Sequence, residues 1–121
     1  EIKKISKIKK FNKIIFLHCV SSYPCNFKDL NFFKFKELDL ISQNQIGYSG
    51  HYQGTEDAII AITLGASYVE KHFTVDNNLP GRDNKFAILP KDLKKISEFR
   101  NNFLEMITKK NIDLQDGEMD I

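Results

Sequence analysis

The sequence predicts an α/β fold built on a parallel sheet, because two kinds of hydrophobic pattern alternate along the chain. Apolar runs that suit strands cover residues 13–20, 45–49 and 67–73. Stretches with apolar residues at steps of three and four, which suit amphipathic helices, cover residues 31–42, 55–64 and 90–108. Strands that alternate with helices are joined by right-handed crossovers and form parallel sheets.

The first part of the chain supplies the end of a helix, a strand and a second helix. Glu1–Asn12 carries isoleucines at steps of three and is expected to be the end of a helix with one apolar stripe. Lys13–Val20 is almost continuously apolar, which is typical of a strand covered on both faces, and Pro24 prevents its continuation. Asn31–Ser42 places its apolar side chains on one wide helical face.

The rest of the chain repeats the order of strand and helix twice. Gln45–Ser49 is a short strand, and Thr55–Leu64 is a well-buried helix with its first residue as N-cap. Gly65 is expected to end that helix in a left-handed conformation. Ser67–Phe73 is the third strand, and Pro90–Thr108 is a final helix that opens on proline in its first turn.

Polar side chains follow the second and third strands where these strands finish. Ser49 and His51 share one face at the exit of the second strand, and Glu70 and His72 share one face of the third. In a parallel β/α barrel the carboxyl ends of the strands build the active site. We therefore expect a carboxylate and two imidazoles to converge at the mouth of a partial barrel. A buried Glu70 would need a partner, such as a hydroxyl-rich ligand or a cation-bound water.

The histidines are candidate metal ligands through this placement alone. His51 and His72 match no local metal motif, and a single histidine is more often a satisfied core or surface residue than a ligand. With oxygens from water or substrate completing the shell, a six-coordinate ion such as Mn²⁺ or Mg²⁺ fits better than structural zinc. His18 also ends a strand, but its neighbours on the same face are apolar, so we do not assign it as a ligand.

Two loops complete the candidate site. The connection from Thr74 to Leu89 is long for a strand-to-helix loop, and its Pro80-Gly81 pair predicts a defined turn that would aim Asp83 at the mouth. A solvated surface loop is the alternative. Ser21 and Tyr23 lie just past the first strand, where their hydroxyls could meet a polar substrate or serve as ordinary turn residues.

Composition and charge argue against several classes of protein. A net charge of +2 is too small to predict a nucleic-acid partner, and the longest apolar run, Ala58–Leu64, is far shorter than the ~20 residues of a membrane span. Cys19 and Cys25 lack the spacing of a zinc knuckle or a redox pair, so two free thiols in a reducing cytoplasm are expected. A complete barrel needs about 250 residues, so this chain of 121 residues is expected to be a piece of a longer polypeptide.

Five short segments together resemble the sialic acid synthase (N-acetylneuraminate synthase) family. In chain order they read His-Cys-Val-Ser-Ser-Tyr-Pro from residue 18, Gly-Tyr-Ser-Gly-His from 47, Leu-Gly-Ala-Ser from 64, Glu-Lys-His-Phe-Thr from 70 and Leu-Pro-Gly-Arg-Asp from 79. The likeness runs in register from about residue 14 to residue 99. It implies that residues 1–108 are roughly the last three β/α units of a (β/α)8 TIM barrel, and that residues 109–121 are a tail toward a further C-terminal region.

The resemblance also implies a reaction and a set of roles. Members of the family condense phosphoenolpyruvate with an N-acetylated hexose, such as N-acetylmannosamine or its 6-phosphate, to a nine-carbon 2-keto acid and free phosphate, and the complete enzymes are homodimers. By position, His51 and His72 resemble the protein ligands of the divalent metal, and Glu70 and Asp83 resemble the catalytic carboxylates. Contacts to the substrates are implied for Ser49 (phosphate of phosphoenolpyruvate) and for Tyr23 and Ser21 (sugar).

Three departures from the family pattern bear on these expectations. Gly50 stands where many relatives have Asp, Arg82 where many have Pro, and Ser21 where some have Asn. The first leaves His51 without a neighbouring carboxylate. The last leaves the sugar open, so the product could be a related acid such as legionaminic or pseudaminic acid. Two alternatives also stay open: a non-catalytic fragment that retains a metal-binding or sugar-binding shape, and another metal-dependent barrel aldolase or lyase.

Overall fold

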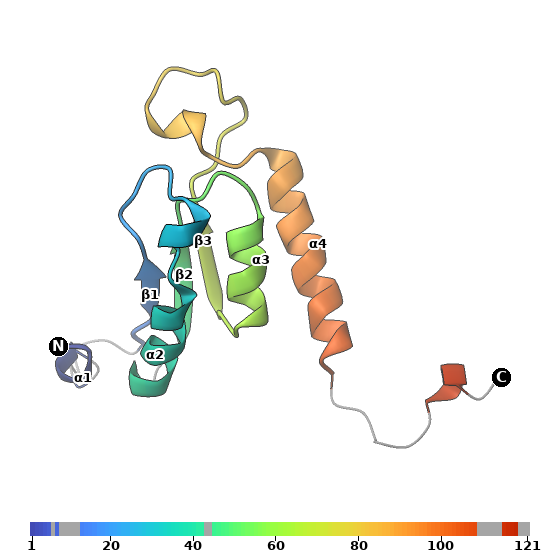
Figure 1. The fold of residues 1–121 in the computed structure, drawn as a ribbon. Coiled ribbons are helices and arrows are strands. Elements are labelled where there is room, and N and C mark those ends of the chain that lie inside the picture. The colour runs from blue at the N-terminus through green and yellow to red at the C-terminus, as the bar shows by residue number, and fades with distance from the viewer. Residues whose placement is uncertain (6, 8–12, 43–44, 109–114, 119–121) are drawn as a thin grey trace.

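A parallel three-stranded sheet in the order β1-β2-β3 lies at the centre of the computed structural model (Figure 1). The structure describes residues 1–5, 7, 13–42, 45–108 and 115–118. The strands are β1 (Phe16–Cys19), β2 (Ile46–Gly50) and β3 (Tyr68–Lys71). Phe16 lies opposite Ile46 in the first ladder, and Ser49 lies opposite Glu70 in the second. The parallel sheet predicted from the alternating pattern is therefore confirmed.

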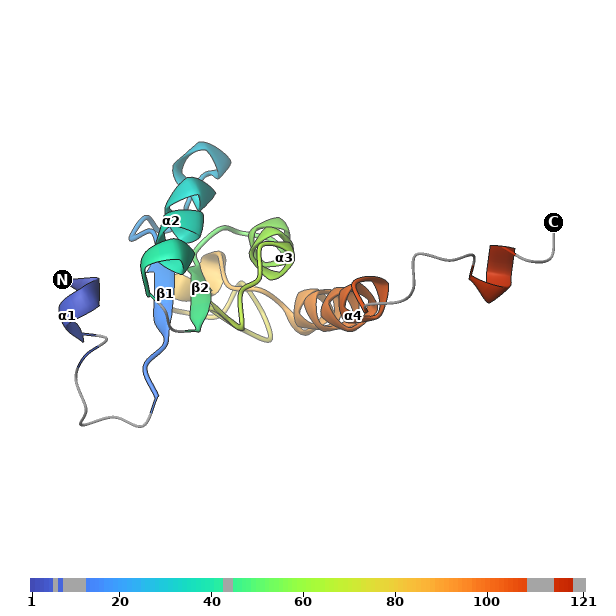
Figure 2. The ribbon, with the colours of Figure 1, turned by 90° about the horizontal axis from the view of Figure 1, so that it is seen from below.

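Two helices, α2 (Phe32–Ser42) and α3 (Glu56–Thr63), cover one side of this sheet. The other helices are α1 (Ile2–Ile5), which contacts α2, and α4 (Pro90–Met106), which packs on α3; 3₁₀ turns lie at Phe27–Asp29, Asp83–Lys85 and Asp116–Glu118. Seen along the strands, α2 and α3 lie on the same side of the sheet, and α4 lies beyond α3 (Figure 2). This is the arrangement that right-handed crossovers between parallel strands produce.

Two apolar clusters hold these helices to the sheet. Phe35 of α2 and Ala61 of α3 pack against Ile46 and Tyr48 of β2, and all four are buried. The second cluster joins α3 to α4 through residues Ala58, Ile62, Ile88 and Ile96. Val69 of β3 touches both clusters, so the side chains on the helix-covered face of the sheet form one continuous core with the helices.

The opposite face of the sheet is open in the described part of the chain. Leu17 and Tyr68 on this face are 39% and 44% exposed, and Glu70 is also exposed. The prediction that the first strand would be covered on both faces is therefore not met by these residues. The strand is also shorter than the predicted run of residues 13–20, because only Phe16–Cys19 pair with β2.

The helix ends agree closely with the sequence. Gly65 has φ +94° and follows α3, and Pro90 opens α4, as predicted. Thr55 occupies the N-cap position of α3, but its hydroxyl makes no capping bond; instead its amide donates to the Glu56 carboxylate. Of the helix predicted at the N-terminus, Ile2–Ile5 is helical among the described residues, and residues 6 and 8–12 lie outside the described part of the chain. The start of the predicted acidic tail, residues 111–114, also lies outside it. Among the helices that the structure describes, none has the length and apolar character needed to cross a membrane.

Candidate active site

Two imidazoles meet at the carboxyl ends of the neighbouring strands β2 and β3. His51 follows β2 directly and His72 follows β3, and their ring centroids are 5.2 Å apart. The side chains that end parallel strands leave the sheet at the same edge, which is why residues far apart in sequence become neighbours here. The predicted convergence of the two histidines is thus present in the structure.

The buried His51 ring has a defined orientation. Its Nδ1 lies 2.9 Å from the carbonyl oxygen of Val20, in the loop that follows β1. A carbonyl only accepts hydrogen bonds, so Nδ1 carries the proton and Nε2 of the neutral ring keeps its lone pair. Histidines that bind metals usually have their second nitrogen oriented in this way. The Val20 carbonyl therefore orients the His51 ring without a carboxylate at position 50.

His72 is oriented from a different side. Its Nδ1 lies 3.5 Å from Asp83 Oδ2, and its own carbonyl accepts a 2.8 Å hydrogen bond from the Ile88 amide. The Asp83 side chain is mostly exposed, so this contact is weak in energy. It nevertheless turns the carboxylate toward the histidines, as the Pro80-Gly81 turn predicted.

The loop that presents Asp83 is held by asparagine side chains. Asn77 Nδ2 donates to the carbonyls of Asn84 at 2.6 Å and Ala87 at 2.9 Å, and Asn84 Nδ2 donates to Pro80 at 2.8 Å. Gly81 adopts φ +128°, a conformation that favours glycine. The loop arches over the carboxyl ends of the strands (Figure 1). Its asparagine hydrogen bonds give it a defined conformation there.

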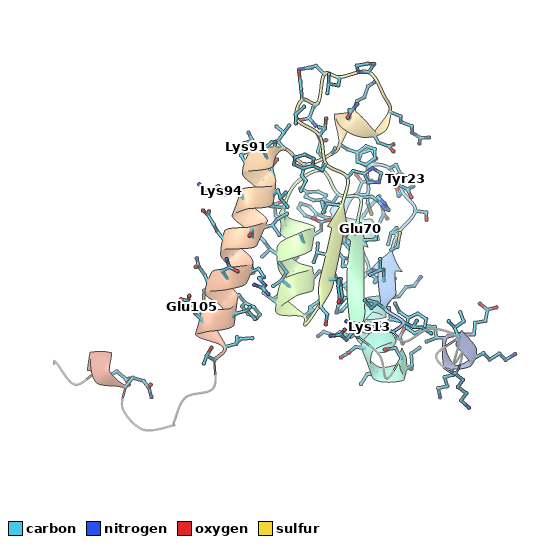
Figure 3. All side chains as sticks on the ribbon, turned by 180° about the vertical axis from the view of Figure 1, so that it is seen from behind. Lys13, Tyr23, Glu70, Lys91, Lys94 and Glu105 are labelled. Carbon is cyan, nitrogen blue, oxygen red and sulfur yellow. The ribbon has the colours of Figure 1, made fainter. Side chains whose placement is uncertain are left out.

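Tyr23 packs against both imidazoles. Its ring centroid lies 4.2 Å from that of His51 and 6.2 Å from that of His72. Figure 3 shows Tyr23 near the end of the sheet, beneath the loop, and Glu70 farther down on β3. The buried Phe86 lies 5.1 Å from the His72 ring and completes an aromatic wall. Phe86 was not predicted, because no spacing in the sequence marks a loop aromatic as a neighbour of a strand end.

Ser49 and Glu70 form a pair on the open face of the sheet. Ser49 Oγ donates a 2.7 Å hydrogen bond to Glu70 Oε1. Glu70 is exposed in the described part of the chain, and the Ser49 hydroxyl is its partner there. Ser21 is exposed on the loop after β1, next to Val20, whose carbonyl orients His51.

The remaining histidine and the cysteines have no comparable arrangement. His18 is buried against α2, and its Nε2 bonds the Leu30 carbonyl at 2.8 Å, so it is a satisfied core histidine. Cys19 and Cys25 are free thiols. Within the described residues, no group of three or more His, Cys, Asp or Glu side chains is arranged to hold a metal ion. Among the described residues, the two imidazoles are the candidate protein donors to a metal at this edge, and they suit an ion whose other ligands are water or substrate oxygens.

The profile of the NeuB family matches residues 1–111, which is nearly the whole chain. The chain belongs to the NeuB family. Its curated relatives include an N,N'-diacetyllegionaminic acid synthase of Campylobacter jejuni, 38% identical over 85 residues that cover 70% of this chain and 25% of the relative. A second is the N-acetylneuraminate-9-phosphate synthase of Drosophila melanogaster, 40% identical over 88 residues that cover 72% of this chain and 24% of the relative. The chain therefore spans about a quarter of the length of these NeuB relatives.

A solved NeuB structure has the same fold over most of the chain. The N-acetylneuraminic acid synthetase of Leptospira borgpetersenii, crystallised with citrate, superposes with a TM-score of 0.75 at 36% identity. The match covers 87% of this chain and 37% of that one. The NeuB fold of the described residues thus agrees with the resemblance found in the five sequence segments.

Proposed function

We propose that this chain is part of a nonulosonic acid synthase, which condenses phosphoenolpyruvate with an N-acetylated hexose similar to N-acetylmannosamine and releases phosphate. The observation that carries the proposal is the convergence of His51 and His72, with Asp83 and Tyr23 beside them, at one edge of a NeuB sheet. Relatives are named as synthases of sialic, legionaminic and pseudaminic acids, so the shared chemistry is the joining of a three-carbon unit to an amino sugar.

The parallel sheet is the proposed end of a (β/α)8 TIM barrel. Its open face presents the large apolar side chains of Leu17 and Tyr68 beside Glu70. Exposed apolar side chains of this kind mark a surface that another part of a protein covers. Further strands of a barrel would place these side chains in its interior and would bring additional substrate contacts to the same mouth. Residues 1–108 are then the barrel segment, and residues 109–121 lead to another region. We expect the 121 residues alone to show no turnover.

The proposed metal is Mn²⁺ or Mg²⁺, held by Nε2 of His51 and Nε2 of His72. The orientation of His51 through Val20 fits this role, because it leaves the unprotonated nitrogen for a ligand. When bound, such a cation polarises a carbonyl oxygen and favours attack on its carbon. Tyr23 borders both rings and, with Ser21, is proposed to contact the sugar.

The carboxylates are proposed to handle protons. Glu70 would accept a proton from the water that adds to the enol-derived carbon, and Asp83 would face the open-chain sugar beside His72. Ser49 is proposed to contact the phosphate of phosphoenolpyruvate. Its hydroxyl has a single proton, which it donates to Glu70 in this structure, so binding of phosphate would transfer that bond and leave Glu70 Oε1 free to take a proton.

The decisive experiment measures phosphate release and metal binding in the full-length protein. Metal-free protein is supplied with Mn²⁺, phosphoenolpyruvate and a panel of N-acetylated hexoses. We expect turnover with at least one of them and its loss in His51→Ala and His72→Ala, both of which should also lose Mn²⁺. His18→Gln is the control, because His18 is the other histidine of the chain and bonds a core carbonyl. Unchanged activity and metal content in both alanine variants would refute the proposal.

The resemblance further predicts a homodimer for the complete protein, and the expected free thiols predict the cytoplasm. Sedimentation of the full-length protein tests the dimer. A monomer with full turnover would show that the second subunit is not required.

A further inference from the structure

A buried ion pair lies behind the two histidines, on the helix-covered side of the sheet. Lys71 Nζ lies 2.8 Å from Asp57 Oδ2 and 2.9 Å from Oδ1, and the two side chains are 5% and 0% exposed. A buried pair of this kind contributes little net stability, because removing two charges from water offsets their attraction. The role of this ion pair is therefore sought in the further hydrogen bonds that Lys71 and Asp57 make.

Every polar atom of this pair has a partner. Lys71 Nζ also donates a 2.7 Å hydrogen bond to the carbonyl of Tyr52, so its three protons all meet acceptors. Asp57 Oδ2 accepts a 3.0 Å bond from the Tyr48 hydroxyl. The amide of Ala58 donates to Asp57 Oδ1 at 2.8 Å. The carboxylate at the start of α3 is thus fixed from three sides.

The bond to Tyr52 joins the two segments that carry the imidazoles. Tyr52 directly follows His51, and Lys71 directly precedes His72. Lys71 also lies opposite Gly50 in the ladder between β2 and β3. One ammonium group therefore ties the backbone just after His51 to the last residue of β3, which directly precedes His72.

Gly50 leaves the space through which the lysine side chain passes. A Cβ at this position would lie 2.5 Å from Asp57 Oδ2, 2.6 Å from Tyr48 Cε1 and 3.0 Å from Lys71 Cδ. A larger residue would displace this cluster from the sheet. The glycine next to His51 and the lysine next to His72 are therefore parts of one arrangement.

We propose that Lys71 is a positioning residue that sets the spacing of the two imidazoles, through its bond to the Tyr52 carbonyl. Asp57 holds the ammonium in place at the start of α3, and neither side chain touches substrate. The expected effect of Lys71 on metal affinity rests on the proposed metal function of His51 and His72. The effect of Lys71 on the spacing of the two rings is expected with or without metal.

The test uses the full-length protein and the double variant Lys71→Met/Asp57→Asn. Methionine keeps the length and apolar stem of lysine, and asparagine keeps an acceptor for Tyr48, so no charge is left buried and unpaired. With isotope-labelled histidine, we expect the nuclear Overhauser contact between the His51 and His72 rings to be present in the metal-free wild type and lost in the variant. Mn²⁺ affinity should fall by about tenfold or more, as for other groups that orient metal ligands.

Tyr48→Phe is the matched control. It removes the hydrogen bond to Asp57 from the same buried network but leaves the bond from Lys71 to Tyr52 in place. We expect its unfolding temperature to fall while the ring contact and the Mn²⁺ affinity stay at the wild-type level. A purely structural role for Lys71 predicts instead that metal affinity follows the unfolding temperature in both variants.

The outcomes separate this inference from the proposed function. A preserved ring contact in Lys71→Met/Asp57→Asn overturns the inference, whether or not the protein binds metal. Failure of the wild type to bind Mn²⁺ refutes the proposed metal function, while the ring contact still decides the role of Lys71. If the double variant does not fold, the triple variant Tyr48→Phe/Asp57→Leu/Lys71→Met replaces the whole network by apolar groups and is judged by the same ring contact.

Discussion

Ser49 donates its only hydroxyl proton to Glu70, across directly opposite positions of β2 and β3 at 2.7 Å. The pair lies on the open face of the sheet, below the two imidazoles. A phosphate group also needs a donor, so a substrate that binds at Ser49 competes with Glu70 for the same proton. The proposed phosphate contact and the proposed proton acceptor are therefore coupled, and the coupling can be measured.

Glu70→Gln tests this coupling. The amide oxygen can still accept from Ser49, so the geometry is retained while the basic carboxylate is lost. We expect kcat for phosphate release to fall by about 100-fold or more, with Mn²⁺ affinity unchanged, because general base catalysis typically contributes this much. Ser49→Ala should instead raise KM for phosphoenolpyruvate more than it lowers kcat. A Glu70→Gln protein with normal kcat would remove Glu70 from the proton-transfer step.

Gly50→Ala is expected to destabilise the fold. The new methyl group would lie 2.5 Å from Asp57 Oδ2 and 2.6 Å from Tyr48 Cε1, two side chains that are hydrogen-bonded to each other. Overpacking of this kind costs about 1–3 kcal/mol in free energy of unfolding. Gly117→Ala is the control, since nothing lies within 4 Å of its added Cβ. Denaturant unfolding of the full-length protein measures both, and equal stabilities would show that the cluster can relax around a side chain.

The fold and the placement of the histidines could be predicted because both depend on local patterns. Alternating strand and helix signals determine a parallel sheet, and parallel strands bring their carboxyl ends to one edge. His51 and His72 follow from that rule alone. The Gly65 turn and the start of α4 at Pro90 were predictable for the same reason, because each depends on the conformational limits of a single residue.

The partners of the site residues could not be predicted in the same way. The Val20 carbonyl that orients His51 is a backbone atom, which carries no sequence signal. Phe86 reaches His72 only through the path of the loop. Lys71 did leave a signal, because strand alternation places it on the face covered by helices. A buried lysine requires a carboxylate, and the first turn of α3, the helix before β3, offers Glu56 and Asp57; the structure pairs Lys71 with Asp57.

Alkaline pH should weaken the fold through Tyr48. Burial, together with the Asp57 carboxylate, raises the pKa of this phenol above its ordinary value of 10.0. The fold favours the neutral phenol, so the contribution of Tyr48 is complete below about pH 10 and is lost as pH rises toward the folded-state pKa. The free energy of unfolding should therefore fall with pH above this value, by up to about 1.4 kcal/mol per pH unit from this group. Denaturant unfolding at alkaline pH should show a shallower fall in Tyr48→Phe, and equal slopes in the two proteins would contradict the assignment.

Asn77→Ala should loosen the loop that carries Asp83 while leaving the sheet intact. The side-chain amide of Asn77 donates to the carbonyls of Asn84 and Ala87, and so joins the first half of the loop to its second half. Each such bond contributes about 0.5–1.5 kcal/mol, and their loss exposes the backbone locally without unfolding the core. We expect faster amide hydrogen exchange at Phe86 and Ala87, whose amides bond to the Asp83 carbonyl, and unchanged exchange in β2.

Asn78→Ala provides the matched comparison for this loop, because Asn78 is exposed and its side-chain amide donates to the Asp76 carboxylate, two residues earlier in the same half of the loop. Its exchange pattern should remain that of the wild type. If Asp83 acts on the sugar from this loop, Asn77→Ala should also raise KM for the N-acetylated hexose. Mn²⁺ affinity should change little, because the contact between Asp83 and His72 is exposed and weak and His51 is held by the Val20 carbonyl. Equal exchange rates and equal KM in the two asparagine variants would mean that the turn at Pro80-Gly81 holds the loop without Asn77.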